Sequence, residues 1–157
     1  MTENDKLLND LWEFGNRVLG VYHVCDVEAT VYGGWNNSQR AWAVATEIGG
    51  SPAVVVDASY VKWTPADLVE RYLHEVGHHK HGDVPTGRIR AYLVANPAQP
   101  TPAAVKASEQ REARAWAFAK AQRPRFEAWR KQKQLDNLQR DVDEIFAMLG
   151  LPPRRVK

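Results

Sequence analysis

The histidine pair in His74-Glu75-Val76-Gly77-His78 is the feature that most constrains how this chain can fold. Residues four apart lie one above the other on an α-helix, so a helix would direct both imidazoles toward one point. The intervening glutamate would lie beside that point. Two imidazoles at this spacing commonly bind one divalent metal ion. The segment must therefore be helical if these side chains act together.

The flanking residues favour such a helix between Thr64 and Gly82. Thr64-Pro65 supplies an N-cap followed by the proline that suits a first helical position, and Asp67 stands where a capping-box acid belongs. Gly82 is a natural stop. Apolar residues recur on one face of the segment, namely Leu68, Val69, Tyr72, Leu73 and Val76.

The pattern is that of HExxH zinc sites, in which two neutral imidazoles bind the ion and the glutamate is a general base. His74 and His78 are therefore predicted metal ligands, Glu75 the predicted catalytic base and Zn²⁺ the predicted cofactor. Zinc lowers the pKa of bound water to about 7, and the base takes the proton as the water attacks a polarised carbonyl. The alternative interpretation is a solvated, histidine-rich helix end that binds metal only adventitiously.

A catalytic zinc ion needs a third protein ligand and one open position. The metzincin register is not met, because His81 and Val84 occupy the positions of its glycine and its ligand. Asp83 misses that register by one residue. The remaining source of a ligand is a glutamate on a following helix.

That second helix is predicted to begin at Thr101-Pro102, again a cap followed by proline, and to run to about Ala121. It carries Glu109 and Glu112. Either glutamate meets the requirement for a third ligand.

The other histidines have less specific roles. His81 follows His74 by seven residues and lies near the predicted metal-binding face, whereas His79 is turned roughly 100° from His78. Either could contact a substrate or its oxyanion, or cap the C-terminal end of the helix, and we favour capping. His23 stands alone on a strand-like segment and is interpreted as a structural or surface histidine.

Apolar residues at helical spacing predict an N-terminal helix between Asn4 and Gly20. Short β-prone runs then predict a small, mainly antiparallel sheet of three or four strands before the histidine helix. An edge strand of such a sheet could line the cleft and pair with an extended substrate. The runs are Val21–Val24, Ala29–Tyr32, Ala41–Thr46 and Ala53–Val56, with turns at Gly33-Gly34, Asn36-Asn37 and Gly49-Gly50.

Prolines 85, 97, 100 and 102 bracket a predicted loop with at most a short ordered piece around Ile89 to Val94, and this loop could cover a substrate. After Pro124 we expect a last helical region, broken near Gln134 and ended by Gly150. Its apolar stripe is interpreted as core or as a docking face. The stripe consists of Leu135, Leu138, Val142, Ile145 and Leu149.

Composition favours one globular domain over residues 1–157, with a core of about residues 4–124 and a helical extension of about residues 125–150. The net charge of +2 is small, so nucleic acid is not an expected partner. Cys25 is the single cysteine, which excludes an intrachain disulfide and suggests a buried thiol. No signal peptide or membrane-spanning run is visible, so we expect a cytoplasmic protein that does not bind membranes.

Four segments between about residues 54 and 124 form a combined pattern, namely Val54-Val55-Val56-Asp57, Thr64-Pro65, His74-Glu75-Val76-Gly77-His78-His79 and Glu112-Ala113-Arg114-Ala115-Trp116-Ala117. Taken together, they resemble the ImmA/IrrE family of zinc metallo-endopeptidases. In that family the glutamate of the later helix is the third zinc ligand, which implies this role for Glu112 and leaves Glu109 as the alternative. The implied fold is α+β and zincin-like, of the gluzincin type: N-terminal helix, small sheet, HExxH helix, ligand-bearing helix and helical C-terminal region.

The resemblance also implies a zinc-dependent endopeptidase that cleaves one specific intracellular protein. A transcriptional regulator, such as a repressor of a phage or other mobile element, would be a substrate of this kind. The alternative is a zinc-containing binding module or antirepressor that docks onto a regulatory protein without cleaving it. Nucleic-acid binding through the basic C-terminal helix ranks last, and no oligomeric state is implied.

Overall fold

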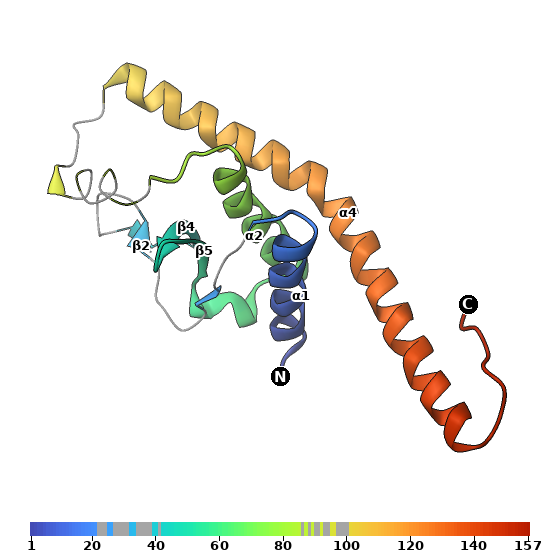
Figure 1. Cartoon of the computed structure of the whole chain (residues 1–157). Helices are drawn as coiled ribbons and strands as arrows, with labels where there is room; N and C mark the ends of the chain where they lie inside the picture. Colours follow the sequence, from blue (N-terminus) through green and yellow to red (C-terminus); the bar gives the residue numbers. More distant parts are fainter. Residues whose placement is uncertain are drawn as a thin grey trace. The chain divides into compact units, whose positions relative to one another are not determined.

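A computed structural model describes residues 1–21, 25–26, 32–33, 39–40, 42–85, 87, 89, 92, 95–96 and 101–157 (Figure 1). The chain combines helices with a small sheet, which confirms the α+β class. It divides into two compact units, Met1–Arg123 and Pro124–Lys157. Within the described residues, no helix has both the length and the apolar content that a bilayer crossing requires.

The first helix, α1 (Glu3–Arg17), begins at a reciprocal capping box, and it confirms the predicted N-terminal helix. The Thr2 hydroxyl accepts the Asp5 backbone N–H at 3.1 Å, and the Asp5 carboxylate accepts the Thr2 backbone N–H at 2.6 Å. Its apolar face is buried and packs against α2 (Pro65–Lys80). The buried residues of that face include Leu7, Leu8, Leu11 and Phe14.

Strands β4 (Ala43–Ile48) and β5 (Ser51–Val56) form an antiparallel hairpin around Gly49-Gly50. Both glycines have positive φ, 58° and 81°, as a two-residue hairpin turn of this twist requires. The predicted strands Ala41–Thr46 and Ala53–Val56 thus correspond to β4 and β5, except that Ala41 lies outside the described residues.

The rest of the sheet differs in part from the sequence prediction. Strand β1 (Cys25–Asp26) pairs with β5 in parallel, which leaves β4 at one edge of the order β1-β5-β4. Strands β2 (Tyr32–Gly33) and β3 (Gln39–Arg40) form a separate antiparallel pair, so Gly33 belongs to a strand and not to the predicted turn. Residues 22–24, 27–31 and 34–38, which include most of the other two predicted strands and the Asn36-Asn37 turn, lie outside the described residues.

Helix α2 follows the short 3₁₀ helix η1 (Ala58–Lys62) and has the predicted ends. The Thr64 hydroxyl accepts the backbone N–H of Asp67 at 3.1 Å, and Pro65 occupies the first helical position. The helix stops before Gly82, whose φ is 69°. Its predicted apolar face is buried against α1 and the sheet.

Helix α4 (Pro102–Met148) begins as predicted, because the Thr101 hydroxyl accepts the backbone N–H of Ala104 at 3.1 Å. It then continues through Pro124 and Gln134, so the predicted end near Ala121 and the predicted break near Gln134 are wrong. A proline inside a helix costs about 3 kcal/mol. The many alanine, lysine, arginine, glutamine and glutamate residues on both sides favour the helical state strongly enough to offset that cost.

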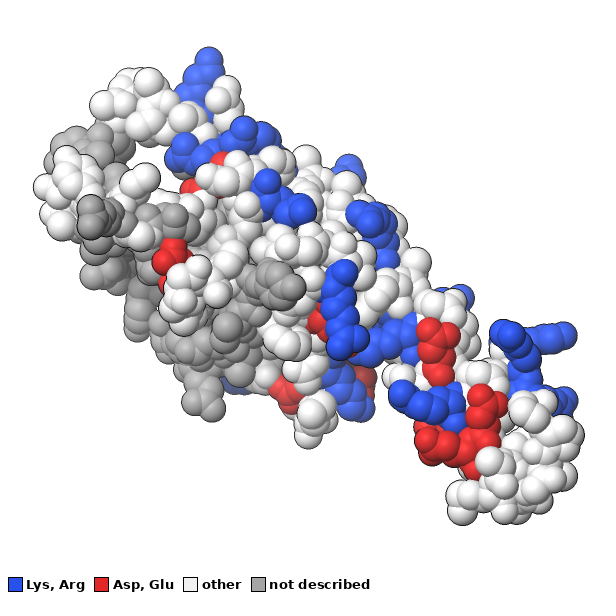
Figure 2. Space-filling model, viewed as in Figure 1, with Lys and Arg blue, Asp and Glu red and all other residues white. Residues whose placement is uncertain are grey.

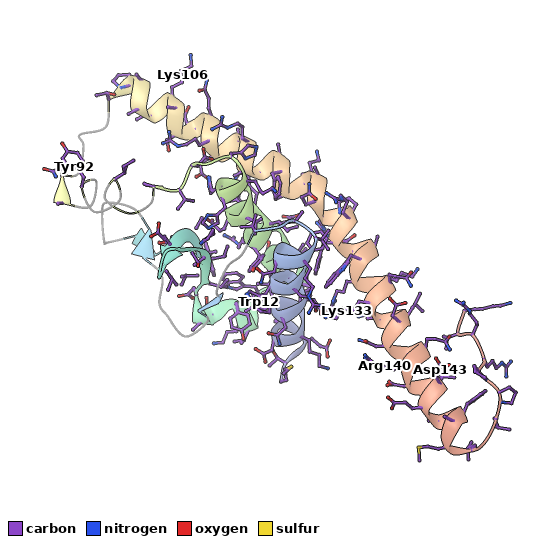
Figure 3. The ribbon with its side chains drawn as sticks, in the orientation of Figure 1. Trp12, Tyr92, Lys106, Lys133, Arg140 and Asp143 are labelled. Carbon is purple, nitrogen blue, oxygen red and sulfur yellow. The ribbon has the colours of Figure 1, made fainter. Side chains whose placement is uncertain are left out.

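The second unit contains the C-terminal part of α4 and a tail held by Gln139. The amide of Gln139 donates to the carbonyl of Arg154 at 2.7 Å and accepts the backbone N–H of Val156. Acidic and basic side chains are interspersed on the face of this unit that Figure 2 shows, and Arg140 and Asp143 project from its helix in Figure 3. Three residues of the predicted apolar stripe are exposed, namely Leu138, Ile145 and Leu149.

Candidate metal centre

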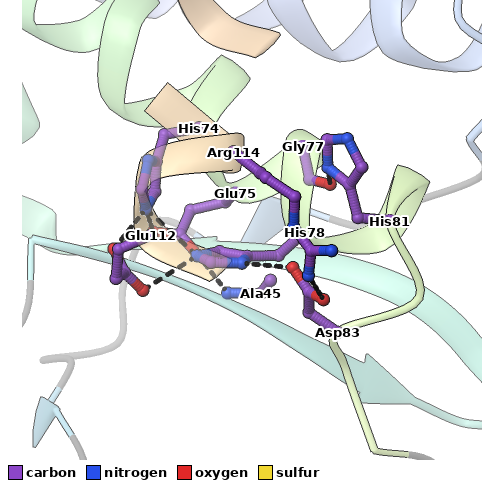
Figure 4. Close-up of polar contacts among 9 residues, drawn as sticks. All are labelled: Ala45, His74, Glu75, Gly77, His78, His81, Asp83, Glu112 and Arg114. Carbon is purple, nitrogen blue, oxygen red and sulfur yellow. Dashed lines mark hydrogen bonds and ion pairs between the residues drawn. The ribbon is translucent and has the colours of Figure 1, made fainter. Parts of the chain in front are cut away.

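Helices α2 and α4 bring His74, His78 and Glu112 together (Figure 4). The Nε2 atoms of His74 and His78 are 2.9 and 3.1 Å from the two carboxylate oxygens of Glu112, and they lie 3.1 Å from each other. Each of the three residues offers one ligand atom, and these three atoms lie within 4.8 Å of one another. This group can therefore hold a metal ion.

The structure distinguishes the two glutamates that the sequence left as alternatives. Glu112 faces both histidines, whereas Glu109, one turn earlier on α4, is exposed and is not a member of the group found among the described residues. The side chain of Glu112 is 52% exposed, while those of the two histidines are mostly buried. The group is thus closed on the α2 side and open toward solvent at its carboxylate.

Burial and contacts with two neighbouring rings hold the imidazole of His74 in place. Its ring centroid lies 4.1 Å from that of Trp116 on α4 and 4.6 Å from that of His78, which it meets edge to face. Burial lowers the pKa of His74 below its usual 6.5, although the Glu112 carboxylate acts in the opposite direction. The imidazole is therefore kept in the neutral form that a metal ligand requires.

Glu75 lies beside the group without joining it. One carboxylate oxygen, Oε1, is 4.0 Å from His74 Nε2, and the other, Oε2, accepts the backbone N–H of Ala45 on β4 at 2.8 Å. Burial raises the pKa of Glu75 to about 8; the hydrogen bond from Ala45 opposes this shift, and the charge of Glu112 adds to it. The sheet thus fixes the orientation of the residue predicted to be the catalytic base.

The group opens into a cleft of about 430 Å³. Residues Ala43, Val44 and Ala45 of β4 line it on one side, and α4 contributes Ser108 and Arg111 as well as Glu112. Of the two edge strands of the sheet in the described residues, β4 is therefore the one that lines the cleft. An elongated ligand lying in this cleft would contact both the strand and the metal-binding group.

Asp83 and Arg114 make contacts at the site that the sequence analysis did not predict. Asp83 Oδ2 is 3.2 Å from His78 Nδ1, and Asp83 Oδ1 accepts a hydrogen bond from Arg114 Nη2 at 3.1 Å. From the sequence, Asp83 entered only as a possible third metal ligand that misses the metzincin register by one residue. A carboxylate directly after a helix C-terminus is unfavourable with the helix dipole, and that position was the available signal that Asp83 has specific partners.

His79 and His81 point to backbone carbonyls. His79 Nε2 donates to Ala53 O of β5 at 2.8 Å, and burial lowers the pKa of His79. His81 Nδ1 donates to Gly77 O at 2.8 Å, the contact expected of a residue that caps the helix end. Neither histidine belongs to the metal-binding group.

Other sequence predictions fall outside the described part of the chain. These are the role of His23, the burial of the Cys25 side chain and most of the ordered piece predicted around residues 89–94.

The chain matches no protein-family model, and no curated protein or solved structure matches it. Membership of the ImmA/IrrE family stays a prediction from the sequence, and the candidate metal centre rests on the geometry of His74, His78 and Glu112.

Proposed function

We propose that this protein is a zinc-dependent endopeptidase that hydrolyses a peptide bond in one specific intracellular protein. The observation that carries the proposal is the convergence of His74, His78 and Glu112 next to Glu75 in an open cleft. Two imidazole nitrogens and one carboxylate oxygen form a ligand set typical of catalytic zinc sites that keep a position for water or substrate. The expected substrate, a transcriptional regulator of a phage or mobile element, rests on the family resemblance alone.

Zinc held by these residues would supply a water of lowered pKa and would polarise a substrate carbonyl. The protein supplies the base. Glu75 directs Oε1 toward the metal-binding group because Ala45 holds Oε2. Burial raises the pKa of Glu75 to about 8 and the hydrogen bond from Ala45 opposes this rise, and a metal ion held beside it would favour the ionised form that a general base requires.

The position of β4 supports a peptide as the substrate. This strand is at the edge of its sheet and lines the cleft through Ala43, Val44 and Ala45. An extended peptide can add to such an edge through main-chain hydrogen bonds. Its scissile carbonyl would then lie beside the metal-binding group.

The test compares wild type with Glu75→Gln, a variant that keeps the ligands and removes the base. Elemental analysis should give about one zinc per chain in both proteins, and sharp loss of zinc in His78→Ala and Glu112→Ala. Each zinc-loaded protein is then incubated with a host-cell protein extract, and newly formed N-termini are identified by mass spectrometry. New termini should form with wild type and not with Glu75→Gln.

The same experiment distinguishes a peptidase from a binding module. The protein acts by docking if wild type binds zinc but produces no new N-termini, and if Glu75→Gln has the same effect in cells as wild type. If wild type binds no zinc even after reconstitution, both the zinc peptidase and the zinc-containing binding module are contradicted.

A further inference from the structure

Asp83 is a buried carboxylate that the proposed reaction does not use. Its side chain is only 7% exposed, and it lies between the end of α2 and the N-terminal third of α4. Each of its oxygens has a different partner, His78 on α2 and Arg114 on α4 (Figure 4). A buried carboxylate with two specific partners connects those partners geometrically.

The contact with Asp83 places a proton on one ring nitrogen of His78. An ionised carboxylate can only accept hydrogen bonds, so His78 Nδ1, which is 3.2 Å from Asp83 Oδ2, is the donor. Nε2 faces His74 and is 3.1 Å from Glu112 Oε1, where the metal would bind. With a metal there, the proton on Nδ1 leaves the Nε2 lone pair for the ion, whereas without a metal the Glu112 carboxylate also attracts a proton to Nε2.

The contact with Arg114 connects the same carboxylate to the helix that carries Glu112. Arg114 follows Glu112 by two residues on α4, and its Nη2 donates to Asp83 Oδ1 at 3.1 Å. A shift of α4 that moved Glu112 away from the histidines would also stretch this ion pair. Asp83 is therefore placed to hold two ligands from two helices in register.

His74 lacks an equivalent partner. Its Nδ1 is buried and has no hydrogen-bond partner among the described residues, and its ring packs against Trp116 instead. Within the described part of the chain, only His78 thus has a carboxylate against its Nδ1.

We propose that Asp83 is a positioning residue that fixes His78 in its Nδ1–H tautomer and, through Arg114, holds Glu112 in place for the metal. This inference rests on the metal site of the proposed function. Residues that orient a metal ligand in this way typically change metal affinity about 10- to 100-fold when they are replaced.

The first test reads the His78 tautomer by ¹⁵N NMR at mildly alkaline pH in metal-free Glu112→Ala protein, which lacks the second carboxylate that faces His78 Nε2. With Asp83 present the proton should be on Nδ1, and Asp83→Asn is compared in this same background. In Asp83→Asn, Arg114 can only donate, so the amide oxygen should turn to Arg114 and the NH₂ group to His78. His78 Nδ1 would then accept, and the proton should move to Nε2. An unchanged tautomer in Asp83→Asn would overturn the proposal.

The second test measures zinc affinity by competition with a chelator. Asp83→Asn and Asp83→Ala should bind zinc about 10- to 100-fold more weakly than wild type, and Arg114→Gln should show a smaller loss with the wild-type tautomer. Glu109→Gln is the matched control, since it removes an exposed carboxylate from α4 outside the metal-binding group. Circular dichroism establishes that each variant is folded.

The two tests separate this inference from the proposed function. If wild type and Asp83→Asn bind zinc equally, Asp83 has no positioning role while the metal site stands. If wild type binds no zinc, the proposed function fails, and the tautomer measured without metal still decides whether Asp83 fixes His78.

Discussion

Gly77 on α2 lies against Ala115 on α4 so closely that a Cβ atom at Gly77 would be 3.2 Å from both the Cα and the carbonyl oxygen of Ala115. The same atom would be 3.2 Å from the Cβ of Phe118. Ala115 lies three residues after Glu112 on the same helix. The missing side chain at Gly77 thus allows the close helix approach that lets Glu112 reach both histidines.

Replacing Gly77 with alanine should therefore weaken zinc binding while it leaves the thermal stability of the metal-free protein nearly unchanged. Alanine favours the helix by about 1 kcal/mol over glycine, whereas the contact with the backbone of α4 must be relieved by a shift of a few tenths of an ångström. We expect the melting temperature of metal-free Gly77→Ala to change little and its zinc affinity to fall. Calorimetry and chelator competition measure the two quantities, and an unchanged affinity would contradict this account.

Zinc should stabilise the folded protein through Glu112 and not through Glu109. A ligand at 100 times its dissociation constant stabilises the native state by about 2.7 kcal/mol. Thermal unfolding with added zinc and with a chelator should therefore differ in wild type and in Glu109→Ala, and should coincide in Glu112→Ala. If the zinc-dependent shift in melting temperature persists in Glu112→Ala and disappears in Glu109→Ala, Glu109 and not Glu112 is the third zinc ligand.

Asn4 should contribute to stability far from the metal centre. Its buried side-chain amide donates to the carbonyl oxygens of Tyr60 at 2.8 Å and Trp63 at 2.9 Å, which ties α1 to the segment before α2. Asn4→Ala leaves these carbonyls without that donor and should lower the free energy of unfolding by between about 1 and 3 kcal/mol. Asn4→Asp should cost more, because it places carboxylate oxygens against the same carbonyls. Urea denaturation measures both variants.

Asp5 should make stability depend on acid pH. A hydrogen bond from the Tyr60 hydroxyl, followed by those from the backbone and hydroxyl of Thr2, holds the pKa of Asp5 below its usual 3.8. A carboxyl with a lowered folded-state pKa stabilises the protein above its unfolded value, and the effect is lost as pH falls through the folded value.

Between wild type and Asp5→Asn, the difference in unfolding free energy should therefore be largest at neutral pH and should shrink below about pH 4. Urea denaturation across this range measures it. Tyr60→Phe removes the largest cause of the shift and should reproduce part of the effect. Parallel pH profiles for all three proteins would show that Asp5 has no such role.

Local signals in the sequence were sufficient to predict where several helices and strands begin or end. Thr64-Pro65 and Thr101-Pro102 mark the starts of α2 and α4, and Gly49-Gly50 marks the turn between β4 and β5. Each signal acts within about four residues, through a cap or a backbone conformation that only nearby atoms determine. The end of α4 could not be predicted in this way, because a helix-wide sum of propensities outweighed Pro124.

The sequence by itself determined that His74 and His78 share one helix face with Glu75 beside them, since the 3.6-residue period fixes this spacing. Only the tertiary structure decided that Glu112 and not Glu109 meets them, that β4 is the edge strand holding Glu75, and that Asp83 joins His78 to Arg114. Those three outcomes depend on how α2, α4 and the sheet pack. That packing is set by contacts such as Gly77 with Ala115, whose residues are far apart in the chain, and no local spacing encodes it.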